Sequence, residues 1–358
     1  KDAGIADMTD AADGTIAIGN SALGALTSGA SNTAVGYTAG TAITTGERNT
    51  ILGYEALDGG STEVDDNTAI GFRAMTGAIG TEAVNDCVAI GSYALYGALE
   101  QEASGTVAIG VTALGALTSG AENTAVGYQS GIAITTGDEN TALGYQSLKT
   151  LVDGDKNTAV GRLALYSTTG DTNTALGLAA LYSVSSGDNN IGIGAQSGRT
   201  ASPSGNLTTE DNIICLGNDS ITAAHVEVDW TVASDQRDKT DFTALDLGLD
   251  FVKELSPVTY KWDKRSKYGD KEADDYDLTD QTPDGTHKED WLDIGFKAQE
   301  VEALEKAAGY KIADKTNLTT SLTGDGKQYG IQYSKFVPIL VKAIQELSAE
   351  VESLKEQL

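Results

Sequence analysis

Residues 234–239, with the sequence SDQRDK, place a serine and a lysine five positions apart in a strongly charged segment. Serine and lysine are residue types that can act as nucleophile and general base when a folded site activates them. The spacing alone is a weak signal, because a charged turn before a helix has the same composition, and Ser234 or Asp235 would serve as its N-cap. The segment is therefore a candidate site whose chemistry depends on the sequence around it.

Residues that commonly bind metals or form disulfides are few. The chain has two cysteines, Cys87 and Cys215, and two histidines, His225 and His287, and none of them has the spacing of a zinc site. We therefore expect no disulfide framework, no metal site and no cofactor. Cys215 lies in NIICLG at an aliphatic position, which predicts a buried, small apolar residue and not a reactive thiol.

The overall charge excludes several classes of partner. Lys and Arg number 24 against 52 Asp and Glu, which gives a formal net charge of -28. Such a chain repels nucleic acid and anionic membranes, and no basic stripe reverses this locally. No apolar run has the roughly 18 residues of a membrane helix, and no signal peptide is visible. Because the chain opens on Lys1, we expect residues 1–12 to be the remnant of a longer protein.

Internal repetition dominates residues 13–198. Short motifs such as NTAVG, NTALG and NTAIG recur, and a longer duplication relates the segment that begins at Thr15 to the one that begins at Thr106. The repeats align on one glycine, at spacings of 16 to 20 residues and most often 17: Gly19, Gly36, Gly53, Gly71, Gly91, Gly110, Gly127, Gly144, Gly161, Gly177 and Gly194.

A 17-residue repeat is too short for a strand with a crossover helix, so each repeat predicts a short strand, a turn and a second short segment. Alternation within the strand puts the aliphatic residue and the Thr two positions before it on one face, with Ala and Gly on the other. We expect the aliphatic face to form a core and the Ala/Gly face to admit another backbone. The pattern thus favours a β-solenoid in a homo-oligomeric fibre; a monomeric solenoid, such as an ice-binding or calcium-binding roll, is the alternative.

Residues 199–233 form a transition in which the repeats decay. NIICLG resembles a last, degenerate repeat, and HVEVDWTV (225–232) alternates apolar and polar residues as a half-buried strand does.

Residues 234–358 have the pattern of a separate α+β domain. Phe242, Leu245, Leu249 and Val252 recur at helical spacing, and LSPVTYKW (255–262) predicts a strand. Residues 263–291 predict an exposed polar arm that contains a solvated His287. DIGFKAQEVEAL then predicts a strand and a helix, KQYGIQYSKF another strand, and a long helix follows.

The last helix carries a heptad seam over residues 337–358. Its β-branched and Leu positions alternate at spacings of three and four: Val337, Leu340, Ile344, Leu347, Val351, Leu354 and Leu358. This residue choice favours two strands. The alternative is an amphipathic helix packed on its own domain.

The N-T-A-φ-G-x-x-A-L repeats resemble the β-roll head repeats of trimeric autotransporter adhesins and related repeats in bacteriophage tail fibres. This resemblance implies a parallel trimer in which each chain contributes one roll. Against the two strands that the seam residues favour, we therefore expect a trimeric coiled coil, because the seam is short. Residues 233–358 resemble a second family through SDQRDK, LSPVTYKW, IGFKAQEVEAL and YGIQYSKFVPILVKAIQEL in this order. It is the intramolecular chaperone of phage tail fibres and tailspikes, also called the peptidase S74 domain.

The second resemblance implies chemistry at SDQRDK. Members of that family cut their own chain just before the serine with a Ser/Lys dyad, which implies Ser234 as nucleophile, Lys239 as general base and the Ala233–Ser234 bond as substrate. Asp235 and Arg237 are expected to orient the loop. A base must be neutral, which for an ordinary lysine costs roughly 4.6 kcal/mol at pH 7, and burial can lower a lysine pKa by about 3 to 5 pH units. Cleavage that needs such burial would report a completed fold.

The sequence therefore predicts the distal, receptor-binding part of a phage tail fibre, located in the virion and extracellular during host attachment. The expected partners are two further copies of the chain, the rest of the fibre, and a host glycan or outer-membrane protein. Apart from self-processing, no enzyme activity is expected. A polysaccharide-degrading tailspike, which would need paired carboxylates in a groove, and a bacterial trimeric adhesin are the alternatives.

Overall fold

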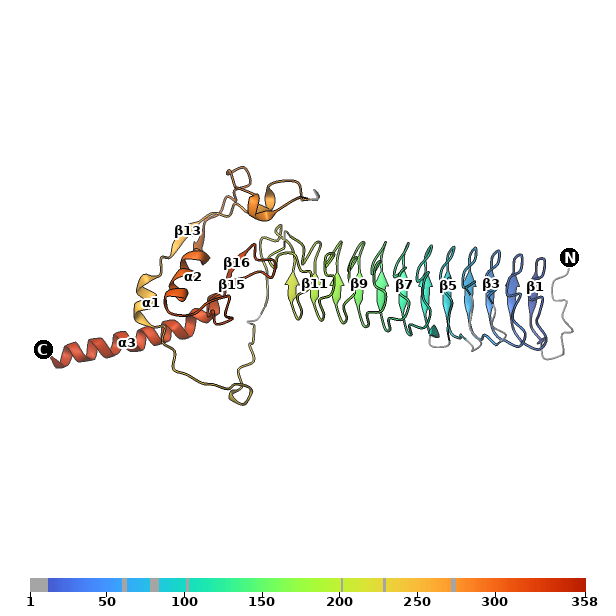
Figure 1. The fold of residues 1–358 in the computed structure, drawn as a ribbon, viewed down its shortest axis with the longest axis horizontal. Helices are drawn as coiled ribbons and strands as arrows, with labels where there is room; N and C mark the ends of the chain where they lie inside the picture. Colours follow the sequence, from blue (N-terminus) through green and yellow to red (C-terminus); the bar gives the residue numbers. More distant parts are fainter. Residues whose placement is uncertain are drawn as a thin grey trace. The chain divides into compact units, whose positions relative to one another are not determined.

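The structure of the chain is a computed structural model that describes residues 12–59, 63–77, 84–100, 103–200, 202–227, 230–271 and 275–358. It divides into two compact units, unit 1 (Lys1–Ser220) and unit 2 (Ile221–Leu358) (Figure 1). The expectation for residues 1–12 falls almost wholly on residues 1–11, which lie outside the described part.

Unit 1 is a β-solenoid, as the repeat predicts. In the described residues, twelve strands of three residues each form one sheet in sequence order, every strand parallel to the next (Figure 1). They are β1 (Ile16–Ile18), β2 (Thr33–Val35), β3 (Thr50–Leu52), β4 (Thr68–Ile70), β5 (Val88–Ile90), β6 (Val107–Ile109), β7 (Thr124–Val126), β8 (Thr141–Leu143), β9 (Thr158–Val160), β10 (Thr174–Leu176), β11 (Ile191–Ile193) and β12 (Ile214–Leu216). The degenerate repeat NIICLG supplies β12, so one more coil follows residue 198.

The face of each strand that lies in the core of the solenoid is the opposite of the predicted one. The middle residue of each strand, usually Ala, is buried, whereas the residues on either side are partly or fully exposed. The prediction that the aliphatic face forms the core is therefore wrong. The buried middle position of the strand usually holds a small side chain, with Ile51 in β3 as a larger exception. The Leu or Met four positions after the repeat glycine fills the rest of the coil, as Leu23, Leu114 and Leu165 do.

The repeat glycines are required by the stacking of coils. At Gly127, φ is +137° and an added Cβ would lie 2.4 Å from the carbonyl oxygen of Gly144 in the next coil. A side chain fits at none of these aligned positions from Gly19 to Gly177, where the nearest backbone atom would be 2.1–2.7 Å away. The predicted close approach of another backbone is thus made by the next coil of the same chain and not by a second copy.

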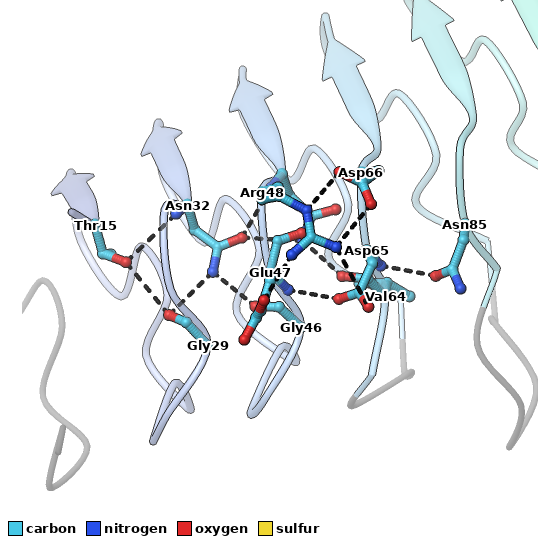
Figure 2. Close-up of polar contacts among 11 residues, drawn as sticks. Thr15, Gly29, Asn32, Gly46, Glu47, Arg48, Val64, Asp65, Asp66 and Asn85 are labelled. Atoms are coloured by element: carbon cyan, nitrogen blue, oxygen red, sulfur yellow. Dashed lines mark hydrogen bonds and ion pairs between the residues drawn. The ribbon is translucent and has the colours of Figure 1, made fainter. Parts of the chain in front are cut away.

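A buried asparagine precedes most strands and joins neighbouring coils. The Oδ1 atom of Asn32 accepts a hydrogen bond from the backbone N–H of Asn49 at 3.0 Å, while its Nδ2 donates to the carbonyl of Gly46 at 2.7 Å in the turn (Figure 2). The same pattern links Asn123, Asn140, Asn157, Asn173 and Asn190. These side chains satisfy buried polar groups that a thin solenoid has no other means of pairing.

Two coils in the middle of unit 1 depart from this pattern. Cys87 and Thr106 stand where the coils on either side of this pair have asparagine. Cys87 is buried, and burial raises the pKa of its thiol to about 11. Cys215 is also buried, as predicted, but it stands at the middle position of β12, opposite Gly192, and not at the predicted aliphatic position, which Leu216 takes.

The predicted strand over residues 225–232 is not formed in the described residues of this segment, and Val228 lies outside them. Val226, Trp230 and Val232 are exposed. An isolated strand gains neither a hydrogen-bonded neighbour nor a covered apolar face, so alternation alone does not order it.

Unit 2 has the predicted α+β composition. Its described helices and strands are η3 (Gln236–Asp238), α1 (Leu249–Glu254), β13 (Val258–Tyr260), η4 (Arg265–Lys267), η5 (Leu278–Asp280), β14 (Asp293–Gly295), α2 (Ala298–Ala307), β15 (Thr320–Leu322), β16 (Tyr329–Ile331), η6 (Tyr333–Lys335) and α3 (Phe336–Glu356). β13 pairs with β14 and β15 with β16, both antiparallel, and α1, α2 and α3 share one hydrophobic core. The strands predicted near 255–262, 292–296 and 327–336 and the two later helices are confirmed.

The first predicted helix of this unit is largely wrong. Phe242 and Leu245 lie outside any helix or strand, and only Leu249 and Val252 belong to a helix, the six-residue α1. Phe242 is exposed, because a helical spacing of apolar residues does not form a helix where nothing covers its apolar face. β15 was not predicted.

The polar arm, residues 263–291, is exposed over most of its described length but is not free. Arg265 donates to the carbonyl of Lys327 at 2.7 Å, and Asp277 forms a 2.8 Å ion pair with Lys327. His287 packs edge-on against the ring of Tyr268. The arm is therefore tied back to the turn between β15 and β16.

Candidate functional site

The segment SDQRDK folds as a single 3₁₀ turn, η3. Asp235 caps it: the carboxylate accepts a hydrogen bond from the backbone N–H of Arg237 at 2.9 Å. At the other end, the backbone N–H of Lys239 donates to the carbonyl of Gln236. The capping role considered for Asp235 is thus present, but no α-helix follows the turn directly: residues 240–248 belong to no helix or strand.

Asp235 and Arg237 also form an ion pair. The guanidinium of Arg237 lies 2.6 Å from the carboxylate of Asp235, and a second nitrogen approaches the same group at 3.1 Å. This contact lowers the pKa of Asp235 and raises that of Arg237. The pair closes the turn on the side of its first residues, and the supporting role of Asp235 and Arg237 stays a prediction.

The turn brings Ser234 and Lys239 into direct contact. Lys239 Nζ donates to Ser234 Oγ at 2.5 Å, and the same Nζ is 3.4 Å from the Ser234 carbonyl oxygen. Ser234 and Lys239 are five positions apart in the sequence, and the single turn of 3₁₀ helix between them brings their side chains into contact. A hydroxyl with an amine at hydrogen-bond distance has the geometry of a nucleophile and its base.

The chemical state of the pair depends on water. Ala233, Ser234 and Lys239 are all exposed in the single chain, and no residue of η3 is buried. A protonated amine donates to the hydroxyl and cannot accept its proton. For Lys239 to act as a base, a surface that excludes water must cover the turn.

The heptad residues of α3 are exposed as well. Val337, Ile344 and Leu354 are each at least 60% exposed, and the other predicted seam residues are also on the surface. A different stripe of the same helix, Phe336, Ile339 and Ala343, is buried in the core of unit 2. The seam is therefore not the face that holds α3 to its own domain, and it stays a predicted coiled-coil surface.

Sequence reasoning missed two contacts that hold the chain after the turn. The Tyr310 hydroxyl donates to Asp246, and the carboxylate of Glu346 accepts the backbone N–H of Leu249 at 2.6 Å. These residues are 64 and 97 positions apart, and nothing in their local sequence marks them. The one sequence signal near these contacts is Gly248, a glycine just before a helical pattern.

No group of His, Cys, Asp or Glu that could hold a metal ion occurs among the residues that the structure describes. Within the same residues, no helix is long and apolar enough to cross a membrane.

Comparison with known proteins places the turn at the start of a recognised domain. Residues 234–310 match the family model Peptidase_S74, chaperone of endosialidase. No curated protein and no solved structure matches the chain. A β-solenoid followed by such a domain fits a tail-fibre or tailspike-like protein, and the match begins at Ser234, the first residue of the candidate dyad.

Proposed function

We propose that the chain is the distal part of a phage tail fibre whose C-terminal domain drives homotrimerisation and then cuts the chain between Ala233 and Ser234. The observation that carries the proposal is the contact of Ser234 Oγ with Lys239 Nζ at the first residues of the matched domain. The expected location is the virion, extracellular during host attachment, with a host glycan or outer-membrane protein as receptor.

The exposed face of the solenoid supports association of copies. The third residue of many strands is exposed and aliphatic, including Ile18, Leu52, Leu143, Leu176 and Ile193. Beside this row, exposed aromatic rings follow the repeat glycine and stack between coils, as in Tyr37 on Tyr54 with centroids 5.0 Å apart and Tyr128 on Tyr145 at 5.4 Å. Because a soluble chain rarely exposes so continuous an apolar surface, we assign this face to contacts between copies.

The proposed cleavage uses the chain's own groups. Neutral Lys239 Nζ accepts the Ser234 Oγ proton while Oγ attacks the carbonyl carbon of Ala233. The C–N bond to Ser234 then breaks, its nitrogen takes the proton from Lys239, and water hydrolyses the ester that links Ala233 to the hydroxyl. Burial of Lys239 in the assembly would supply the neutral amine, so the cut would follow assembly.

The test compares the intact and native masses of the full chain with those of Ser234→Ala. We expect the wild type to yield one piece ending at residue 233 and one beginning at residue 234, with a trimeric N-terminal piece, and the variant to stay intact and trimeric. A wild-type chain that stays intact would refute self-cleavage, and a monomer in both would refute the fibre. Release of reducing sugars from host glycan would instead favour a tailspike.

A further inference from the structure

Helix α1, the first helix after the candidate dyad, begins without a cap of its own. Its N-cap position is Gly248, which has no side chain to pair the free N–H groups at the start of the helix. The pairing comes from Glu346 on α3, whose Oε2 accepts the Leu249 N–H at 2.6 Å. The start of α1 is thus capped by a side chain 97 residues further along the chain.

The contact between Glu346 and Leu249 requires a residue without a side chain at position 248. A Cβ at residue 248 would lie 2.2 Å from Oε2 of Glu346 and 2.7 Å from its carboxyl carbon. Any other residue would push the carboxylate away from Leu249. The cap that Glu346 provides therefore depends on glycine at position 248.

Glu346 lies at the end of the stripe that holds α3 to unit 2. It follows the buried Ile339 and Ala343 at helical spacing, on the same face of the helix. Its other oxygen is 3.2 Å from Lys342, and the pKa of Glu346 is lowered by the Leu249 N–H and then by Lys342. The flanking Ile344 and Leu347 belong to the exposed seam. One turn of α3 therefore carries both the cap of α1 and part of the predicted association surface.

Between the dyad and α1, the chain makes its contacts with unit 2 mainly at residues 246–249. Asp246 is bonded to Tyr310, Leu247 is buried in the core of unit 2, and Leu249 is capped by Glu346. Residues 240–244 are exposed and belong to no helix or strand. Residues 246–249 are thus the point at which the chain leaving Lys239 enters the folded domain.

We propose that Glu346 is a positioning residue for self-cleavage: by capping α1 it fixes where the dyad turn joins the domain, and so makes the cut depend on docked α3. This inference rests on the proposed self-cleavage and adds a residue that acts through backbone geometry without touching the reacting atoms. Because α3 is synthesised after the turn, the cap also prevents the turn from being placed before the C-terminal helix is folded.

The test uses the full chain with four changes. Glu346→Ala removes the cap, Glu346→Gln keeps an oxygen that can accept the Leu249 N–H, and Gly248→Ala displaces the carboxylate without altering it. Glu350→Ala, one turn further along the exposed face of the same helix, is the matched control. The readouts are the rate of appearance of the cut chain by intact mass, the native mass, and hydrogen exchange of the Leu249 amide.

We expect Glu346→Ala and Gly248→Ala to slow cleavage by about 5- to 10-fold with faster exchange at Leu249 and an unchanged native mass, as loss of a helix cap would do. Glu346→Gln should restore most of the rate, and Glu350→Ala should match the wild type. Equal rates for Glu346→Ala and Glu350→Ala would overturn the proposal, as would a loss of association in Glu346→Ala, which would assign the residue to assembly. An uncut wild type would instead show that self-cleavage itself fails, before any variant is compared.

Discussion

The two units of the chain differ in how many of their key side chains find partners within the single chain. In unit 1, most coils pair the buried polar groups of the next coil through backbone bonds and asparagine side chains, and an apolar lateral face is left exposed. In unit 2, the dyad turn is formed by its own residues, but the dyad and the heptad seam of α3 are both exposed. The comparison teaches that stacking fixes the solenoid from within one chain, whereas the proposed chemistry of the turn would need a second surface to cover it.

The largest effect should come from breaking the stacking of coils. In Gly127→Ala the new Cβ would meet the Gly144 carbonyl at 2.4 Å, in a backbone conformation that alanine rarely adopts. Strain and overpacking together should destabilise unit 1 by about 3 to 5 kcal/mol. Thermal unfolding of the full chain in a Ser234→Ala background, followed by circular dichroism, measures this loss.

The matched control is Gly105→Asn. Gly105 also has a positive φ, +76°, but no atom lies within 4 Å of an added Cβ, and Asp86 and Glu122 hold the corresponding conformation in neighbouring coils. This variant should unfold close to the reference temperature. Equal loss in the two variants would mean that backbone conformation, and not contact between coils, is what demands glycine.

A smaller effect should follow from breaking one asparagine link. Asn157 is buried, accepts the backbone N–H of Asn173 at 3.0 Å and donates to the carbonyl of Gly170 at 2.9 Å. Asn157→Ala leaves both groups buried and unpaired, which should cost about 2 to 4 kcal/mol.

At Thr106, removing a polar side-chain group should raise the stability of unit 1, and not lower it. Among the described residues its Oγ1 is buried and has no hydrogen-bond partner. Thr106→Val should therefore stabilise unit 1 by about 1 kcal/mol, whereas Thr168→Val, at a buried hydroxyl that accepts the Gly170 N–H at 3.2 Å, should destabilise it. Unfolding temperatures that move the same way in both valine variants would contradict this account.

The sequence predicts the solenoid well because its signal is repeated. One glycine aligned over many coils fixes the period, the strand position and the parallel order. It does not predict which face is inside, since Thr-Ala-Val alternates equally well in either orientation and only the narrow coil selects Ala34 or Ala125 for the core.

The sequence predicts less of unit 2, because its decisive contacts are distant and occur once. The pair Ser234 and Lys239 is local and could be identified, and the structure brings the two side chains together. The cap from Glu346 to Leu249 joins residues 97 positions apart and depends on how α1 and α3 pack. Alternation over 225–232 and helical spacing from Phe242 were misleading, because a pattern orders a segment only where another surface covers it.

The smallest effect concerns the ion pair that closes the turn. Arg237 lowers the pKa of Asp235, so the pair contributes fully above the ordinary pKa range of a carboxyl group, and its contribution is lost as the pH falls through the lowered value. Because both side chains are exposed, the effect on overall stability should be slight and should weaken with salt. The Asp235 carboxyl chemical shift, followed during acid titration of the Ser234→Ala chain, measures it. Arg237→Gln should return the Asp235 pKa toward its ordinary range, and an identical titration in both chains would mean that this contact does not form in solution. If the pair does form, the turn is already closed in the single chain, and the proposed assembly would have only to exclude water from Lys239.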